Sequence, residues 1–207
     1  MFKRIVVLCA LGLVTVAGAH ASTLLPGTSV SASPLGYGGT NLYFVGGTLA
    51  FGGSTANYAA NVYRDPSNVF CSGCLDFAFI VDNQSDTDIF ESFSVAKFPG
   101  TIAVGYSTAD GGNAAPTLIS STLNGTITFD FAAAGGAGLL PHHVSDALVI
   151  QTSDLSGFGL GTLSLTDAAG LTAPGIGLNP IPEPSTLVLF GSGVAGLLGA
   201  ARRRFLA

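Results

Sequence analysis

The sequence predicts an all-β domain, an antiparallel β-sandwich, placed between an N-terminal signal helix and a C-terminal transmembrane helix. From residue 22 to residue 181 the apolar side chains recur with a period of two rather than 3.6, as in 75–81 and 126–131, which is the pattern of half-buried strands. Turn signals separate these runs, and Asn124-Gly125 favours a hairpin because both positions accept positive φ. The abundance of Gly, Ser and Thr disfavours a helical domain.

The expected strands are short and follow one another closely. They cover 41–45, 48–52, 57–63, 75–81, 89–96, 101–107, 117–122, 126–131, 146–152 and 160–166. Turns are expected at Gly46-Gly47, Gly52-Gly53, Pro99-Gly100, Asp110-Gly111-Gly112 and Asn124-Gly125. Many short strands separated by such turns indicate two packed sheets of the jelly-roll or Ig-like type. We expect this domain to cover residues 22–167 and a Pro/Gly-rich linker to follow at 168–181.

The composition limits both the size of the protein and its partners. The chain has 207 residues, enough for one medium domain with targeting segments. Only 9% of them are charged, against roughly a quarter in an ordinary soluble protein. Residues 22–181 contain two basic and eleven acidic residues, which gives this part a net charge of -9. A highly charged disordered chain and a basic nucleic-acid binder are therefore excluded.

The first 21 residues have the three parts of a secretory signal peptide. Two basic residues stand near the start, 5–17 is an apolar run, and Ala19 and Ala21 are the small residues that signal peptidase requires. We expect export through the Sec translocon and cleavage by signal peptidase before Ser22.

The last 26 residues contain three elements in a defined order. The motif Pro182, Glu183 and Pro184 is followed by an uncharged apolar segment at 185–201, and then by the cluster Arg202, Arg203 and Arg204. A helix over 185–201 would be about 26 Å long, the short end of the range that spans a bilayer. Arginines directly behind such a span stay in the cytoplasm. We therefore expect an inner-membrane-anchored precursor whose sandwich lies outside.

This order of elements resembles the PEP-CTERM sorting signal of Gram-negative bacteria, over residues 182–207. The resemblance implies that an exosortase, a multi-span membrane enzyme, recognises and processes the tail. It also implies a final place at the cell surface or outside the cell, often in species that make exopolysaccharide and biofilm. Segments 73–77 and 145–152 resemble the secreted domains that precede such tails, and this second resemblance brings no established activity.

Cys71 and Cys74 form the only cysteine pair left after signal cleavage. In an oxidising compartment we expect them to form a disulfide that closes a tight turn. A thioredoxin-type redox pair would need the first cysteine at a helix N-terminus, whereas 75–80 has the pattern of a strand. A zinc site would need a second pair of ligands.

Two other clusters carry ligand-type side chains. His142 and His143, with Asp146 nearby, could bind a metal or supply a base. Adjacent residues on a strand point to opposite faces, however, and the pair follows a proline in an expected surface loop. We therefore favour solvated histidines.

The densest acidic group consists of Asp82, Asp86, Asp88 and Glu91, between two expected strands. Oxygen ligands on such a loop could hold calcium, although their spacing fits no EF-hand. Asp82, Asp86 and Asp88 are weak metal candidates, and a solvated acidic hairpin loop is the favoured interpretation.

The sequence contains no recognisable catalytic motif. A Gly-x-Ser-x-Gly elbow, a His-Glu-x-x-His pair and a phosphate loop are all missing. We therefore expect an exported surface protein that is not an enzyme and has no cofactor. Its expected role is structural or adhesive, with exopolysaccharide as a candidate partner. The alternatives are a carbohydrate- or calcium-binding module and, third, a secreted hydrolase with two unidentified carboxylates.

Overall fold

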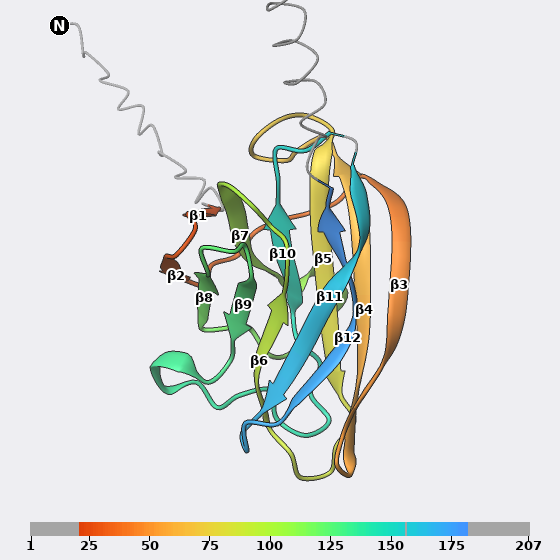
Figure 1. The fold of residues 1–207 in the computed structure, drawn as a ribbon, viewed down its shortest axis with the longest axis vertical. Helices are drawn as coiled ribbons and strands as arrows, with labels where there is room; N and C mark the ends of the chain where they lie inside the picture. The colour runs from red at the N-terminus through yellow and green to blue at the C-terminus, as the bar shows by residue number, and fades with distance from the viewer. Residues whose placement is uncertain (1–20, 156, 182–207) are drawn as a thin grey trace, which may run out of the picture.

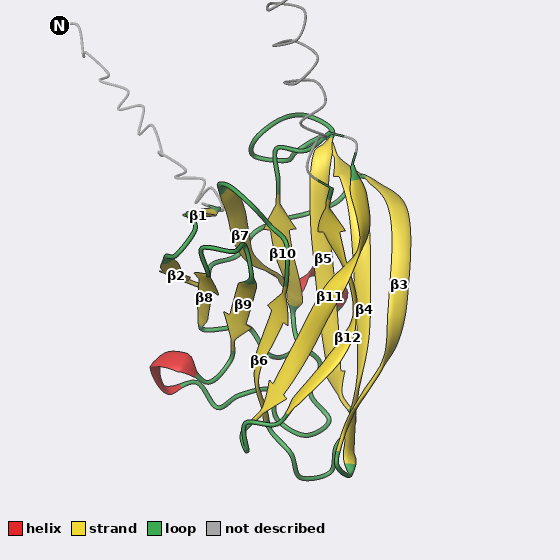
Figure 2. Cartoon of the chain, viewed as in Figure 1, coloured by secondary structure: helices red, strands yellow, loops and turns green. Residues whose placement is uncertain are grey.

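The structure, a computed structural model, describes residues 21–155 and 157–181. These residues form two six-stranded sheets packed face to face, in which all strand pairs are antiparallel (Figures 1 and 2). The predicted all-β fold with two antiparallel sheets is therefore confirmed. The expected signal helix, transmembrane helix, PEP motif and arginine cluster lie outside the described residues, and the jelly-roll or Ig-like type stays a prediction.

Each sheet combines strands from both halves of the chain. The first has the order β1 (Ser22–Leu24), β7 (Ile102–Ser107), β10 (Ala147–Gln151), β5 (Cys74–Asn83), β4 (Ser54–Asp65) and β3 (Thr40–Phe51). The second has the order β12 (Thr172–Pro180), β11 (Phe158–Asp167), β6 (Phe90–Val95), β9 (Ile127–Asp130), β8 (Leu118–Ser121) and β2 (Ser29–Ser31). Two single-turn 3-10 helices, η1 (Thr108–Asp110) and η2 (Ala133–Gly135), complete the described elements.

The core lies between the two sheets and follows the period-two pattern of the sequence. On β5, Phe77 and Phe79 point into the sandwich and are fully buried. Phe93 on β6 meets Phe79 from the opposite sheet, with ring centroids 5.6 Å apart. Burying a side chain of this size stabilises the fold by roughly 1.5–3 kcal/mol. The aromatic residues of the two sheets therefore hold the layers together.

The expected turn at Gly46-Gly47 is wrong, because both glycines lie inside the continuous strand β3. Gly47 pairs with Tyr58 on β4, and a Cβ on Gly47 would lie 3.0 Å from the Tyr58 hydroxyl. The glycine thus leaves room for the tyrosine ring across the strand. The other expected hairpin at Asn124-Gly125 is present between β8 and β9, although Gly125 alone has positive φ there.

The linker predicted over 168–181 is also wrong, since Thr172–Pro180 forms β12 and pairs with β11 along its whole length. The sandwich domain consequently extends to Pro180 rather than to residue 167. Pro174 is tolerated because β12 is the last strand of its sheet, where a backbone N–H is not required. Gly175 allows close packing, because a Cβ there would lie 2.7 Å from Leu49 on β3.

A segment outside the main core covers the outer face of the first sheet. After β2 the chain crosses this face as residues 32–39 before β3 begins. Leu35 packs there on Ala103 of β7 and Val149 of β10 in a small second cluster. Gly105 makes room for the crossing, because a Cβ on it would lie 2.5 Å from the Leu35 Cβ. Side chains on the outer face can therefore be buried.

Candidate functional site

A cluster of buried polar side chains lies on the outer face of the first sheet. Asp65 ends β4, Asp76 lies on β5, Gln151 ends β10, and Asn68 belongs to the loop at 66–73. All four are buried. Period two turns these strand positions away from the sandwich core, and the 66–73 loop and the crossing segment then cover them. The result is a polar layer in a place where a sheet usually meets water.

Asp76 is the centre of this polar cluster. Its Oδ1 accepts a hydrogen bond of 2.6 Å from Asn68 Nδ2, and its Oδ2 accepts one of 3.0 Å from Gln151 Nε2. Burial, and next a hydrogen bond with the Asp65 carboxyl, raise the pKa of Asp76 to about 8. Two carboxyl groups in such contact cannot both be ionised without strong repulsion. At neutral pH Asp76 is therefore protonated.

The same cluster ties two covering segments to the sheet. Gln151 Oε1 accepts from the Val69 backbone N–H at 3.1 Å, and its Nε2 also donates to the Gly36 carbonyl at 3.0 Å. Asn68 Nδ2 lies within hydrogen-bond distance of the Thr152 carbonyl, at 3.2 Å. One glutamine therefore connects the 66–73 loop, the crossing segment and Asp76.

The carboxyl pair does not have the geometry of a glycosidase. The two carboxyl groups of such enzymes stand about 5 Å or more apart, with the sugar between them, whereas Asp65 and Asp76 are hydrogen-bonded. Asp76 is fully buried and both of its oxygens are occupied, so no substrate reaches it. These contacts hold the covering segments on the sheet.

An open cavity of about 340 Å³ lies beside the polar cluster. The crossing segment lines one side with Tyr37 and its neighbouring glycines, and Asp65, Val69 and Gln151 line the other. The Tyr37 ring packs on the Tyr63 ring at a centroid distance of 5.1 Å, and its hydroxyl donates to the Asp110 carboxylate. The cavity therefore combines an aromatic wall with a carboxyl group and an amide.

Cys71 and Cys74 close the end of the 66–73 loop. The structure pairs them as a disulfide with their Cα atoms 5.4 Å apart, a separation that suits such a bond. Gly73, with φ of 84°, makes the turn between them. Cys74 begins β5 rather than a helix, so the helix N-terminus that lowers a thiol pKa in redox motifs is not found at this pair.

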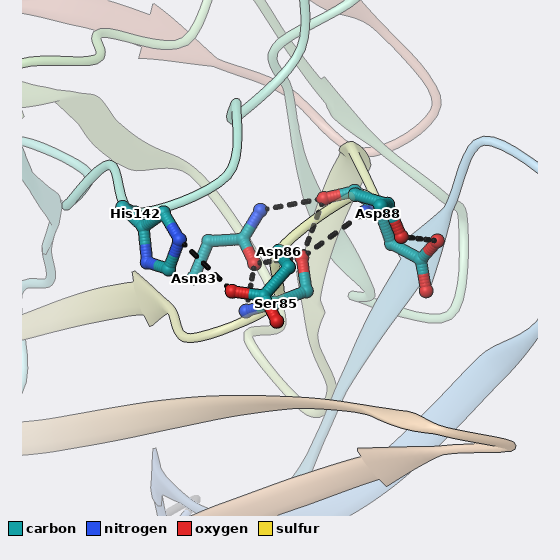
Figure 3. Close-up of polar contacts among 6 residues, drawn as sticks. Asn83, Ser85, Asp86, Asp88 and His142 are labelled. Carbon is teal, nitrogen blue, oxygen red and sulfur yellow. Dashed lines mark hydrogen bonds and ion pairs between the residues drawn. The ribbon is translucent and has the colours of Figure 1, made fainter.

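The acidic loop after β5 is organised by Asn83 (Figure 3). The Asn83 Nδ2 donates to the carbonyls of Asp88 and Leu139, and its Oδ1 accepts from the Ser85 N–H and hydroxyl. Asp88 also accepts a hydrogen bond from Ser54 on the neighbouring hairpin. These bonds fix the conformation of the loop at 84–89.

The metal candidates do not come together around one point. Asp86 pairs with His142, whose Nε2 lies 3.2 Å from the Asp86 Oδ1, and both side chains are exposed (Figure 3). Asp146 is buried, which raises its pKa. Across residues 21–155 and 157–181 no three His, Cys, Asp or Glu side chains are placed to hold a metal ion. The weak candidates Asp82, Asp86 and Asp88 therefore do not form a group that could hold a metal ion.

Within the part of the chain that the structure describes, none of the helices has the length and apolar character needed to cross a bilayer. The predicted span at 185–201 falls outside that part. The described end of the domain is nevertheless informative, because β12 stops at Pro180 and the PEP motif starts at Pro182. A single residue, Ile181, separates the sheet from the motif.

The fold and these features define an acidic, disulfide-containing β-sandwich that leads directly into a C-terminal motif. Residues 180–204 match the family model of the PEP-CTERM protein-sorting motif, and the chain therefore carries this motif. The motif implies exosortase-dependent sorting of an exported protein. Comparisons with curated proteins and with solved structures give no match.

The polar cluster around Asp76 could not be predicted from the sequence. Its one local signal is an aspartate inside an apolar run, Leu75-Asp76-Phe77, and outward positions of a strand are commonly polar. Asp65 lies beyond the expected strand, and Gln151 is 75 residues away from Asp76 in the chain. These residues become a buried cluster only when the 66–73 loop and the crossing segment cover them.

Proposed function

We propose that this protein is an exported precursor that an exosortase-type enzyme sorts to the cell surface or the extracellular matrix, where its sandwich has a structural or adhesive role. In this proposal the Sec translocon and signal peptidase deliver the chain, and the segment at 185–201 holds it in the inner membrane. The mature domain then lies among exopolysaccharide in a biofilm.

The observation that carries this proposal is the sorting motif at 180–204. Two further features agree with it. A paired Cys71–Cys74 suits an oxidising compartment outside the cytoplasm, and the domain ends where the motif begins. The motif is thus presented directly at the end of a folded body.

We further propose that the sandwich has no catalytic activity. Among the described residues, Asp65 and Asp76 form a buried carboxyl pair in which Asp76 holds the covering segments and is itself closed to substrate. Hydrolysis assays over glycosides, esters and peptides test this directly, and turnover that disappears in an Asp65→Asn variant would contradict it.

The sorting proposal is tested by replacing the motif in the full chain with Pro182→Ala, Glu183→Gln and Pro184→Ala. We expect uncleaved precursor to accumulate in the membrane, because the processing enzyme no longer recognises the tail. An Asp86→Asn chain, altered at an exposed residue far from the tail in sequence, serves as the matched control. Intact mass of surface and membrane fractions identifies both cleavage points. Equal surface release of the two variants would refute the proposal.

A second candidate function is carbohydrate binding, favoured by the 340 Å³ cavity with its Tyr37 wall. Aromatic faces with nearby carboxyl and amide groups suit polar, hydroxylated ligands. A glycan array probed with the mature domain, with and without calcium, tests this. A Tyr37→Ala variant should lose any binding seen, whereas a Leu160→Ala variant, altered on exposed β11 surface, should keep it.

A further inference from the structure

The two ends of the sandwich differ in charge and in apolar exposure. We call the end formed by residues 64–74, 152–155 and 180–181 the exit pole, because β12 ends there. In Figure 1 the 66–73 loop and the end of β12 lie together at the top, opposite the loop at 84–89. Hydrogen bonds fix this end to the strands beside it, from the Leu75 N–H of β5 to the Asp154 carbonyl and from the Ile181 N–H to the Gly157 carbonyl just before β11.

Apolar side chains project into solvent at the exit pole. Val69 on the 66–73 loop is 54% exposed, Leu155 on the neighbouring loop 55%, and Ile181 after β12 50%. Phe70 adds a ring that is 37% exposed. These residues come from three separate segments of the chain, so the apolar rim is a property of the folded domain. Exposed apolar groups gathered in this way commonly mark a surface that meets a partner.

Exposed acidic side chains are more numerous at the end of the sandwich opposite the exit pole. The exit pole holds Arg64, an exposed residue and one of the two basic residues of the domain, whose Nη2 lies 3.5 Å from the Leu155 carbonyl. Of its acidic residues, Asp65 is buried and Asp154 is half-exposed, so the exit pole carries about as much exposed negative as positive charge. Exposed or half-exposed acids gather at the other end, where Asp86 and Asp88 follow β5.

The length of the connection decides which surface the exit pole can meet. Residues 181–184 lie between the end of β12 and the predicted span at 185–201. Four residues reach at most about 14 Å when fully extended. So short a tether holds the exit pole beside the bilayer at a high effective concentration, and an exposed apolar rim suits contact with a lipid surface.

We propose that in the anchored precursor the exit pole rests on the outer leaflet of the inner membrane, with Val69, Leu155 and Ile181 in contact with lipid. The acidic end then points away from the anionic headgroups. This inference rests on the proposed membrane-anchored precursor. It adds an orientation, in which the domain sits upright on the membrane and presents the PEP motif at the lipid surface.

The absence of tryptophan from the chain makes the test specific, because one introduced tryptophan is the only one. The full chain is reconstituted in vesicles of phosphatidylethanolamine and phosphatidylglycerol that carry a doxyl quencher on the acyl chains near the headgroup. Leu155→Trp and Val69→Trp report on the exit pole. Leu171→Trp is the matched control, since Leu171 has the same 55% exposure as Leu155 but lies in the β11–β12 turn at the opposite end.

We expect the lipid quencher to remove a large part of the emission of Leu155→Trp and Val69→Trp, and to leave Leu171→Trp unchanged. Acrylamide in the aqueous phase should show the reverse order. Equal emission of all three variants in an inserted chain would overturn the inference alone. Protection from acrylamide without lipid quenching would overturn it as well, in favour of contact with a second copy. A chain that alkaline extraction removes from the vesicles would overturn the anchored precursor itself.

Discussion

The carboxyl groups of Asp65 and Asp76 are in hydrogen-bond contact beneath the loop that the Cys71–Cys74 disulfide closes. Asp65 ends β4, and Asp76 lies on the neighbouring strand β5. Two acids on adjacent strands can share a buried site only while one of them keeps its proton. This pair therefore couples the stability of the covering loop to pH.

The stability of the domain should fall as the pH rises. The pKa of Asp76 is raised to about 8 in the folded state from 3.8, so between these values the folded chain holds a proton that the unfolded chain releases. The free energy of unfolding then decreases with pH across this window, by up to roughly 1.4 kcal/mol per pH unit. Stabilisation is complete below about pH 4 and is lost through pH 8.

Urea unfolding of the mature domain between pH 5 and pH 8.5 measures this effect. An Asp76→Asn variant cannot titrate at this position, so its stability should depend less on pH than that of the unaltered domain. Asp86→Asn, at a side chain that is 92% exposed, is the control and should leave the slope unchanged. Identical slopes for the unaltered domain and Asp76→Asn would contradict the prediction.

Removal of the Gln151 side chain should loosen both covering segments. A Gln151→Ala variant leaves the Val69 N–H and the Gly36 carbonyl without their partner. It also removes the donor to the fully buried Asp76 carboxyl, and an unsatisfied buried group costs about 1–3 kcal/mol. Amide hydrogen exchange should accelerate at Val69 before the rest of the sheet opens. Thr48→Ala breaks an exposed bond to Asn57 and serves as the control, with a far smaller effect. Unchanged exchange at Val69 would show that Gln151 does not hold the loop.

The cysteine pair should be oxidised in the exported protein. Its intact mass should be lower by two hydrogen atoms than the mass of the reduced chain. A loop of four residues gives a modest entropic contribution, about 2 kcal/mol in the chain-entropy model. The Cys71→Ala/Cys74→Ala double variant should therefore fold with a stability reduced by about that amount. Free thiols in protein collected from the cell surface would count against the disulfide.

The strand β12 should be required for stability, although its composition is that of a linker. Leu178 is 1% exposed on β12, and a Leu178→Ala change should cost about 2–5 kcal/mol. Ile176→Ala, at a half-exposed position on the same strand, should change the stability little. Thermal unfolding of the two variants makes the comparison. Equal melting temperatures would restore the interpretation of this stretch as a linker.

Most of the fold could be predicted from the apolar pattern. The strand around Phe77 and Phe79 and the hairpin at Asn124-Gly125 are local features, since alternation and turn residues act within a few positions. The three-residue strands β1 and β2 are too short to show a period. The glycines of β3 and β12 suggested a turn and a linker, because the neighbouring Tyr58 and Leu49 that require them are distant in sequence.

The two-sheet architecture, the cysteine turn and the sorting motif could all be predicted from the sequence, because each depends on residues that are close together in the chain. Only the folded arrangement buries Asp76, brings Gln151 to it from 75 residues away and places three apolar segments at the end where β12 stops. These relationships arise when the crossing segment covers the sheet and distant strands become neighbours. No local pattern records which surface another part of the chain will cover.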